Sequence, residues 1–376
     1  GYFGLRSILV MLMAYGVLHF EEQHALDVYS YFMLGVYMSY VPGALLGDLL
    51  LGNKRATVIG AGLMAIGAFS LCVPNPLVFY AGLALICLGI GLFDSNFLSL
   101  YAKNYLGRKS KMDAGFALLY AVVNFGAMAG AMLVSGWMNS FDYYISAIVG
   151  GLLLAGAAIV SSFVKSESTG ESPEEPNPKS AFTIVAGVIL LAAFYWTIYE
   201  FGMESTGSIQ RQLLELHDAP ISWLIQANVG LFIVPICLTA ALVWTLVHYS
   251  SWAKLAMGFL CGALAFSILH TIPGHFSSAT LPLYMLAILL LALAEINIQP
   301  IVYAFIAKHS NPKYLAIVFS LVTMPTKILA YIYPAYQLHA EGNERNEFLI
   351  CAVLLAVVSV GVGVSFMTKR NAPEWA

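Results

Sequence analysis

Residues 165–179 read KSESTGESPEEPNPK, the longest polar run in the interior of this chain of 376 residues. Proline, serine and glutamate at this density cannot bury a hydrophobic core, so the run predicts a flexible linker. Windows of about 20 apolar residues predict six membrane spans before the run and six after it. The sequence therefore predicts an all-α membrane protein with two six-helix halves, residues 1–164 and 182–376, joined by a linker at 165–181.

The composition supports the same class of protein. Hydrophobic residues make up 60% of the chain and charged residues only 10%, whereas about 25% of a soluble domain is charged. Such an excess of apolar sequence predicts a multi-pass helical protein whose surroundings are the lipid bilayer. The net charge of −3 and the lack of a basic cluster argue against nucleic acid as a partner. The five cysteines lie in apolar segments without metal-ligand spacing, so we expect no metal and no other cofactor.

The distribution of lysine and arginine predicts the orientation of the spans. We expect spans near residues 2–19, 29–51, 56–75, 77–101, 113–137, 143–164, 182–203, 220–248, 252–271, 279–307, 312–336 and 346–368. Basic residues collect on the side of the even-numbered connections and of the C-terminus: Lys54, Arg55, Lys103, Arg108, Lys109, Lys111, Lys165, Lys179, Lys254, Lys308, Lys313, Lys369 and Arg370. The other side holds only Arg211 and Arg345. This asymmetry predicts that both ends of the chain are cytoplasmic.

The beginning of the chain lies almost directly in a span, without a polar tail or a cleavable signal peptide. We expect that the numbering starts part-way into the first helix of a longer protein.

Charged side chains interrupt several of the predicted spans. A charge near the centre of the bilayer costs roughly 2.5–3.5 kcal/mol on insertion scales, so it rarely persists without partners, water or a function. The charges fall on the predicted first, fourth, seventh, tenth and eleventh spans, and they are Arg6, Asp94, Glu200, Glu204, Glu295 and Lys327. This placement predicts a polar cavity through a helical bundle. It favours transport of a small-molecule substrate over an enzymatic reaction.

Residues 43–55, between the second and third spans, read GALLGDLLLGNKR. Asp48 ends one helix, a glycine turn follows, and the basic pair Lys54 and Arg55 can close a cytoplasmic gate by salt bridge and helix-end charge. The segment resembles the cytoplasmic signature of the major facilitator superfamily, although Leu49 stands where an arginine commonly follows the acid. Two six-helix halves joined by a cytoplasmic linker are also typical of that superfamily. The resemblance implies a substrate site between the halves near the membrane midplane, lined by spans 1, 4, 7 and 10.

A longer segment, residues 113–127, reads DAGFALLYAVVNFGA and resembles the fifth-helix signature of the proton-dependent oligopeptide transporters. Three other segments are similar to this family. YFGLR at 2–6 resembles the end of its first-helix motif, and YWTIYE at 195–200 resembles its aromatic-rich seventh helix. EINIQP at 295–300 resembles its tenth-helix acid, which proline follows five residues later.

This resemblance implies that a proton gradient drives the import of di- and tripeptides. The residues that match positions on the carboxylate side of the substrate are Tyr2, Arg6, Tyr37 and Asn124. Glu200 and Glu295 match positions on the amine and proton side, and we expect Arg6 and Asp94 to take part in proton coupling as well. A zwitterion needs a cation at one end of its site and an anion at the other. A buried carboxyl group can carry a proton across and release it when water returns.

The sequence departs from the family in four places, one of which is Leu321, at the position of the eleventh-helix tryptophan of the pocket. The family's acidic and basic first-helix motif would lie before Tyr2, outside this sequence. The fourth helix has Asp94, in the run LFDSN, where the family carries a lysine followed by proline and asparagine. The linker at 165–181 is too short for the two additional helices of the family's bacterial members.

Asp94 leaves two arrangements open. If Asp94 faces Glu295, the two carboxylates share a proton. Alternatively, Lys327 on the eleventh span supplies the missing cation and forms an ion pair with Asp94 between the halves. Glu204 lies one turn after Glu200 on the same helix face and belongs either to a gate or to a solvated rim.

We therefore expect a proton-coupled importer of di- or tripeptides, or of similar zwitterionic solutes, that works by alternating access. We expect it to be a monomer in the plasma membrane, the inner membrane of a bacterium. The alternative is a major facilitator carrier for a siderophore, drug or sugar, antiporters included, and Asp94 and the short linker favour it. A scaffold or receptor that transports nothing is a third class, but it would not need charges on so many cavity spans.

Overall fold

The computed structural model describes residues 18, 20–138, 143–164, 178–217, 221, 224–225, 228–247, 249–272, 280–322 and 344–370. Every regular element in these ranges is a helix. In chain order they are α2 (Glu22–Leu46), the π-helix η1 (Gly47–Leu51), α3 (Asn53–Ser70), α4 (Pro76–Lys103), the 3-10 helix η2 (Leu106–Lys111), α5 (Met112–Met138), α6 (Tyr143–Phe163), α7 (Pro178–Leu216), α9 (Gly230–Leu246), α10 (Ser251–Thr271), α11 (Thr280–His309), the 3-10 helix η3 (Pro312–Tyr314) and α13 (Glu344–Arg370). Residues 315–322 are also helical.

Eight helices within the described ranges are long and apolar enough to cross a membrane: Gln23–Leu51, Pro76–Lys103, Leu106–Gly130, Tyr144–Phe163, Ala181–Leu216, Ser251–Thr271, Thr280–His309 and Arg345–Ser365. Two shorter apolar helices, Gly230–Leu246 and Pro312–Val322, fall within predicted spans. The predicted first span, 2–19, lies almost entirely outside the described residues. The all-helical membrane class predicted from the sequence is confirmed, and the twelve-span count is consistent with these helices.

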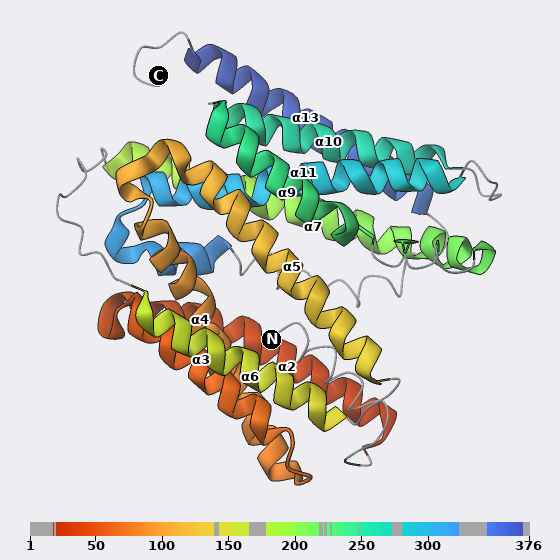
Figure 1. Cartoon of the computed structure of the whole chain (residues 1–376). Coiled ribbons are helices and arrows are strands. Elements are labelled where there is room, and N and C mark those ends of the chain that lie inside the picture. Colours follow the sequence, from red (N-terminus) through yellow and green to blue (C-terminus); the bar gives the residue numbers. More distant parts are fainter. Residues whose placement is uncertain are drawn as a thin grey trace. The chain divides into compact units, whose positions relative to one another are not determined.

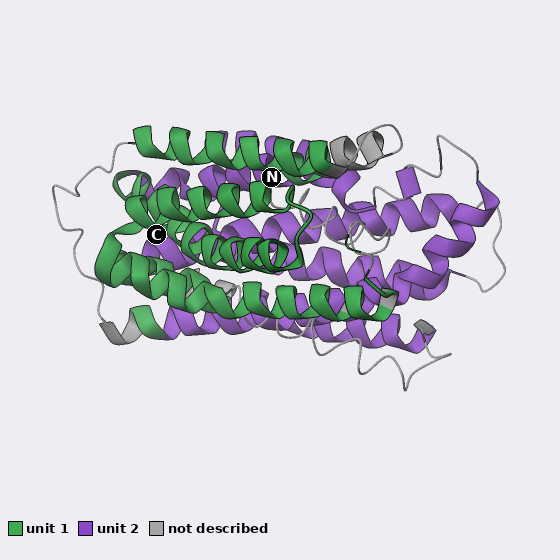
Figure 2. Cartoon of the chain, turned by 90° about the horizontal axis from the view of Figure 1, so that it is seen from below, with its two compact units in different colours: residues 1–107, 125–182, 309–327 green, residues 108–124, 183–308, 328–376 purple. Residues whose placement is uncertain are grey.

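Two compact units divide the chain (Figure 2). Unit 1 comprises residues 1–107, 125–182 and 309–327, and unit 2 comprises residues 108–124, 183–308 and 328–376. Relative to the sequence halves, each unit therefore contains one short segment from the other half. Helix α5 is divided between the units after Asn124. The boundary at the linker stays a prediction.

Helices α2, α3, α4 and α6 lie side by side in unit 1 (Figure 1). Glycines permit the closest approaches, because a Cβ atom on Gly89 of α4 would lie 2.7 Å from the carbonyl oxygen of Gly60 on α3. A Cβ on Gly43 of α2 would similarly clash with the backbone of Gly91 on α4. Small residues at helix contacts allow this dense packing, which replaces the hydrophobic driving force that a bilayer does not supply.

We expect Gly89→Ala to lower the free energy of unfolding by about 1–3 kcal/mol, because the new methyl group overpacks the α3–α4 contact. Gly62→Ala is the matched control, since a Cβ on Gly62 meets no atom within 4 Å. Unfolding of both variants in mixed detergent micelles checks the prediction. Equal stability of the two variants would contradict it.

Aromatic residues form much of the core of unit 2. Tyr195 on α7 packs edge-on against Phe259 on α10, with ring centroids 5.8 Å apart. Phe266 on α10 stacks with Phe348 on α13 at 6.4 Å, and α10 and α13 lie side by side in Figure 1. All four of these side chains are at most 2% exposed. This packing holds α7, α10 and α13 as one framework for the polar residues described below.

Helix α7 is longer than the predicted span 182–203. It begins at Pro178, so the last residues of the predicted linker form its first turn, where proline is favoured. It continues to Leu216 through polar helix-forming residues such as Gln210 and Arg211. A hydropathy window ends where apolar sequence ends, whereas a helix continues as long as its residues favour it.

Candidate functional site

A buried carboxylate is the centre of the polar contacts in unit 2. Glu295 lies in the middle of α11 and is 6% exposed. Its Oε1 accepts a hydrogen bond from the hydroxyl of Tyr120 on α5, and its Oε2 accepts one from the hydroxyl of Tyr199 on α7 at 3.3 Å. Within the described residues no lysine or arginine forms an ion pair with it. Two phenols from different helices thus hold one carboxylate, without an ion pair to any lysine or arginine in the described ranges.

A second contact joins α7 and α11 one helical turn further along. The indole nitrogen of Trp196 donates to Oε1 of Gln299 at 2.6 Å. Trp196 also packs edge-on against Tyr199, with centroids 5.1 Å apart. Pro300 follows directly and removes one backbone donor from α11. The two helices are therefore joined at two successive levels by Tyr199–Glu295 and Trp196–Gln299.

Of the other predicted carboxylates, Glu200 directly follows Tyr199 and lies close enough to Glu295 for their charges to interact, whereas Asp94 lies in unit 1. Glu200 and Glu204 are exposed on α7, and Asp94 is half-buried on α4 in unit 1. Lys327 lies outside the described residues, as do Tyr2 and Arg6. Both arrangements considered for Asp94, with Glu295 or with Lys327, therefore stay predictions, and so do the roles of Glu200 and Glu204.

Two residues predicted on the carboxylate side of the substrate, Tyr37 and Asn124, lie on α2 and α5. Tyr37 on α2 is 8% exposed and belongs to the hydrophobic core of unit 1, together with Val36 and Met64. Asn124 on α5 is half-buried, and its amide donates to the carbonyl oxygen of Tyr120 at 2.9 Å. Their contact with a substrate stays a prediction.

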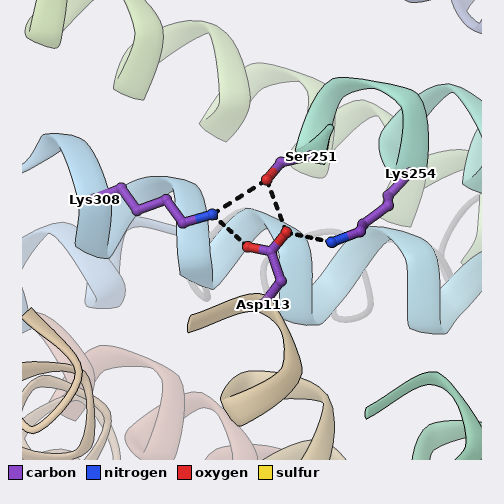
Figure 3. Close-up of polar contacts among 4 residues, drawn as sticks. All are labelled: Asp113, Ser251, Lys254 and Lys308. Atoms are coloured by element: carbon purple, nitrogen blue, oxygen red, sulfur yellow. Dashed lines mark hydrogen bonds and ion pairs between the residues drawn. The ribbon is translucent and has the colours of Figure 1, made fainter. Parts of the chain in front are cut away.

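An ion cluster connects the ends of α5, α10 and α11 in unit 2. Figure 3 shows Asp113, from the first turn of α5, between Lys254 and Lys308. Lys254 Nζ lies 2.6 Å from Asp113 Oδ2, and Lys308 Nζ lies 2.5 Å from Asp113 Oδ1. Ser251 donates to Oδ2 of the aspartate at 2.8 Å and accepts from Lys308 at 3.2 Å. One carboxylate therefore joins three helices.

Burial makes this cluster energetically important. Asp113 and Lys254 are 4% and 7% exposed, and the side chain of Lys308 is 19% exposed. The ammonium group of Lys254 also lies over the ring of Trp244, 4.5 Å from its centroid, which further stabilises the positive charge. Asp113 is the only carboxylate among these partners. Its loss would leave two desolvated lysines next to each other.

Unit 1 has a comparable polar cluster around Asp48. Its Oδ1 accepts from the amide of Asn53 at 2.8 Å, and its Oδ2 accepts from the backbone N–H of Ile317 at 2.9 Å. Asn53 also donates to Asn96 on α4 at 2.8 Å and accepts from Lys103. Asp48 thus caps the start of the helix at 315–322, where a negative charge is favoured.

The basic pair that follows the glycine turn has a smaller part in this cluster than the motif predicts. The turn itself is present, with Gly52 in the left-handed region at φ 78°. Lys54 is half-buried and Arg55 is exposed, and the described ion pairs include neither of them with Asp48. The cluster around Asp48 instead contains Asn53 and Lys103, for which the sequence predicts no part in the gate. The gating role of Asp48, Lys54 and Arg55 stays a prediction.

The sequence profile of the Major Facilitator Superfamily matches residues 2–368. The dipeptide and tripeptide permease B of Photorhabdus luminescens is 31% identical over 208 residues, 53% of this chain and 42% of the permease. The protein of the same name from Aliivibrio fischeri is 32% identical over 196 residues, 50% of this chain and 39% of that protein. The matches thus span about two fifths of the length of these curated relatives.

Solved structures share the fold over nearly the whole chain. A POT family transporter in complex with a thioalcohol-conjugated peptide has a TM-score of 0.66 at 18% identity. The match covers 98% of this chain and 93% of the chain of that transporter. A human organic anion transporter also has a TM-score of 0.66 at 16% identity, with 95% and 89% covered. Likeness at this level of identity shows the fold alone. With the profile match over residues 2–368, it establishes that the chain is a multi-pass membrane protein and belongs to the Major Facilitator Superfamily.

Proposed function

We propose that the protein imports di- or tripeptides together with protons, by alternating access, and that Glu295 is the central residue of the site. The observation that carries this proposal is a buried carboxylate within an apolar span, held by the hydroxyls of Tyr120 and Tyr199. A charge at such a place is costly and usually serves a pathway for substrate or ions. The permeases that match half of the chain support the substrate class.

The tyrosine contacts suggest how Glu295 would act. In the ionised form both carboxylate oxygens accept hydrogen bonds, so the phenols stabilise the anion without adding a charge. The ammonium group of a substrate is a stronger donor and would replace one of the hydroxyls. In the protonated form the carboxyl group is neutral and crosses the apolar core of the protein at lower cost. Glu295 would therefore carry either the proton or the amine, and while the amine is bound there the co-transported proton would lie on another carboxylate of the proposed site, Glu200 or Asp94.

The rest of the predicted site belongs to this proposal. Tyr2, Arg6, Tyr37 and Asn124 would contact the substrate carboxylate, and Glu200, Arg6 and Asp94 would take part in proton coupling. Glu295 is placed first because it is buried, whereas Glu200 is exposed. No enzymatic step is part of the proposed cycle.

The clusters around Asp113 and Asp48 would hold the cytoplasmic ends of the helices together during part of the cycle. The orientation predicted from lysine and arginine places these helix ends, and both chain termini, on the cytoplasmic side. Asp113 precedes the linker in the sequence, whereas both of its lysine partners follow it, so this cluster connects the two sequence halves. We propose the bacterial inner membrane as the location and a monomer as the functional unit.

A carrier for another solute is the second candidate. Asp94 stands where the family resemblance leads one to expect a lysine for the substrate carboxylate, and the human organic anion transporter shares the fold to the same degree as the peptide transporter. Such a carrier would use the same helices with a different substrate.

Ligand-dependent stability distinguishes these candidates. We expect dialanine to raise the melting temperature of the protein in detergent, because a ligand at 100 times its Kd adds about 2.7 kcal/mol to stability. N-acetyl-dialanine, which keeps the carboxylate but lacks the amine, should leave the melting temperature unchanged. Stabilisation by sugars or organic anions but not by dialanine would favour the second candidate. Equal stabilisation by dialanine and its acetylated form would contradict the role of Glu295.

A further inference from the structure

The side-chain amide of Gln299 is a polar group that the proposed transport cycle does not use. It lies on α11, one helical turn after Glu295, and is half-buried. Its oxygen accepts the hydrogen bond from the indole of Trp196 at 2.6 Å. The residue therefore has one defined partner close to the carboxylate.

The indole of Trp196 determines whether the oxygen or the nitrogen of the Gln299 amide faces it. An indole N–H can only donate, so the group that faces it must be the amide oxygen and not the nitrogen. The nitrogen Nε2 then has two N–H donors that point away from Trp196. In the part of the chain that the structure describes, no acceptor contacts them. Because Gln299 is half-buried, these two N–H groups are open to contact from outside its own helix, which makes this amide a candidate for a ligand contact.

The position relative to Glu295 determines what such a ligand must look like. Residues four apart on a helix lie on the same face, with Cβ atoms about 5–6 Å apart. Trp196 and Tyr199 are three apart on α7 and hold Gln299 and Glu295, respectively. Hydrogen-bond donors thus lie next to an anionic acceptor on one face of α11, and both are held by the same neighbouring helix.

We infer that Gln299 Nε2 donates to the carbonyl oxygen of the first residue of the substrate while the substrate's ammonium group binds Glu295. In an α-aminoacyl group the nitrogen and the carbonyl oxygen are joined through two carbons and lie roughly 3 Å apart. One turn of helix can therefore contact both. This inference rests on the proposed function and makes it narrower: the site selects compounds with an α-aminoacyl group over amines that lack a neighbouring carbonyl.

Competition binding with a pair of matched ligands tests this inference. The ligands are dialanine and its thioamide analogue, in which sulfur replaces the first carbonyl oxygen and accepts hydrogen bonds more weakly. Wild-type protein should prefer dialanine by about tenfold, the effect of one hydrogen bond left unmade. Gln299→Met, which keeps the side-chain length, should weaken dialanine binding about tenfold and thioamide binding less than twofold. The preference should therefore disappear.

Two further variants complete the test. Trp196→Phe removes the donor that fixes the amide and keeps an aromatic ring beside Tyr199, so we expect the preference to fall about threefold. This variant decides the test if Gln299→Met does not fold. Asn297→Leu is the matched control, because that amide already donates to Leu293 in its own helix at 2.8 Å, and its preference should equal that of wild type. An unchanged preference in Gln299→Met or Trp196→Phe, or a loss in Asn297→Leu, would overturn the inference while peptide binding stands. If wild-type protein binds neither ligand, the proposed function fails and the inference with it.

Discussion

Replacement of Glu295 by glutamine should abolish gradient-driven accumulation of labelled dialanine in liposomes, by roughly 100-fold or more. Glutamine keeps the size of the side chain and can still contact Tyr120 and Tyr199, but it carries neither a negative charge nor an exchangeable proton. In the proposed complex Glu295 pairs with the ammonium group of the substrate. Removing one partner of a buried charge pair costs about 3–5 kcal/mol, which corresponds to two or more powers of ten in affinity. The measurement is initial uptake under an outside-acid gradient.

Glu215→Gln is the control for this experiment. Glu215 is an exposed carboxylate on α7, far along the helix from Tyr199, and its loss should leave uptake within about twofold of wild type. Retained accumulation in Glu295→Gln would mean that another group carries the proton. Glu200 would then be the next residue to replace.

The second large effect concerns stability. Asp113→Asn should lower the free energy of unfolding by about 3–5 kcal/mol, because the buried Lys254 and the half-buried Lys308 would lose their shared counter-charge. Lys254→Met should cost less, about 1.5–3 kcal/mol, since Asp113 keeps its contact with Lys308. Unfolding in mixed detergent micelles should therefore rank the variants as wild type, Lys254→Met and Asp113→Asn, in order of decreasing stability.

A triple variant separates the electrostatic cause from a packing defect. Asp113→Leu combined with Lys254→Met and Lys308→Met removes all three charges at once. Apolar replacement of a buried ion cluster is often neutral, so this variant should be more stable than Asp113→Asn alone. If the triple variant is the least stable of all, the cluster does not act through charge balance.

The sequence singles out Glu295 as a candidate, but it does not predict which side chains contact it. A carboxylate in an apolar span is conspicuous because of its cost, whereas Tyr120 and Tyr199 are two of 21 tyrosines. The distance along the chain from Tyr120 to Glu295 is 175 residues. Hydropathy and spacing describe local structure and carry no information on such pairings. Both tyrosines lie within segments that resemble the family, 113–127 and 195–200, but the resemblance does not pair them with Glu295.

The partners of the lysines in the Asp113 cluster could not be predicted from the sequence, for a different reason. Lys254 and Lys308 lie at helix ends and were counted with the residues that predict orientation. Lys254 is buried and Lys308 is half-buried against Asp113, which comes 141 and 195 residues earlier in the chain. A lysine at the end of a span looks the same in sequence whether it faces water or a carboxylate. The aspartate belongs to the quoted signature, but its spacing does not identify its partners.

The most direct test of the central claim measures labelled dialanine in liposomes that contain the full-length protein, with and without an imposed outside-acid gradient. The account predicts accumulation above the external concentration only when the gradient is present, because proton entry drives the peptide inward. Uptake that stops at equilibrium and is the same with and without the gradient would contradict proton coupling. No uptake by folded protein would contradict peptide import altogether.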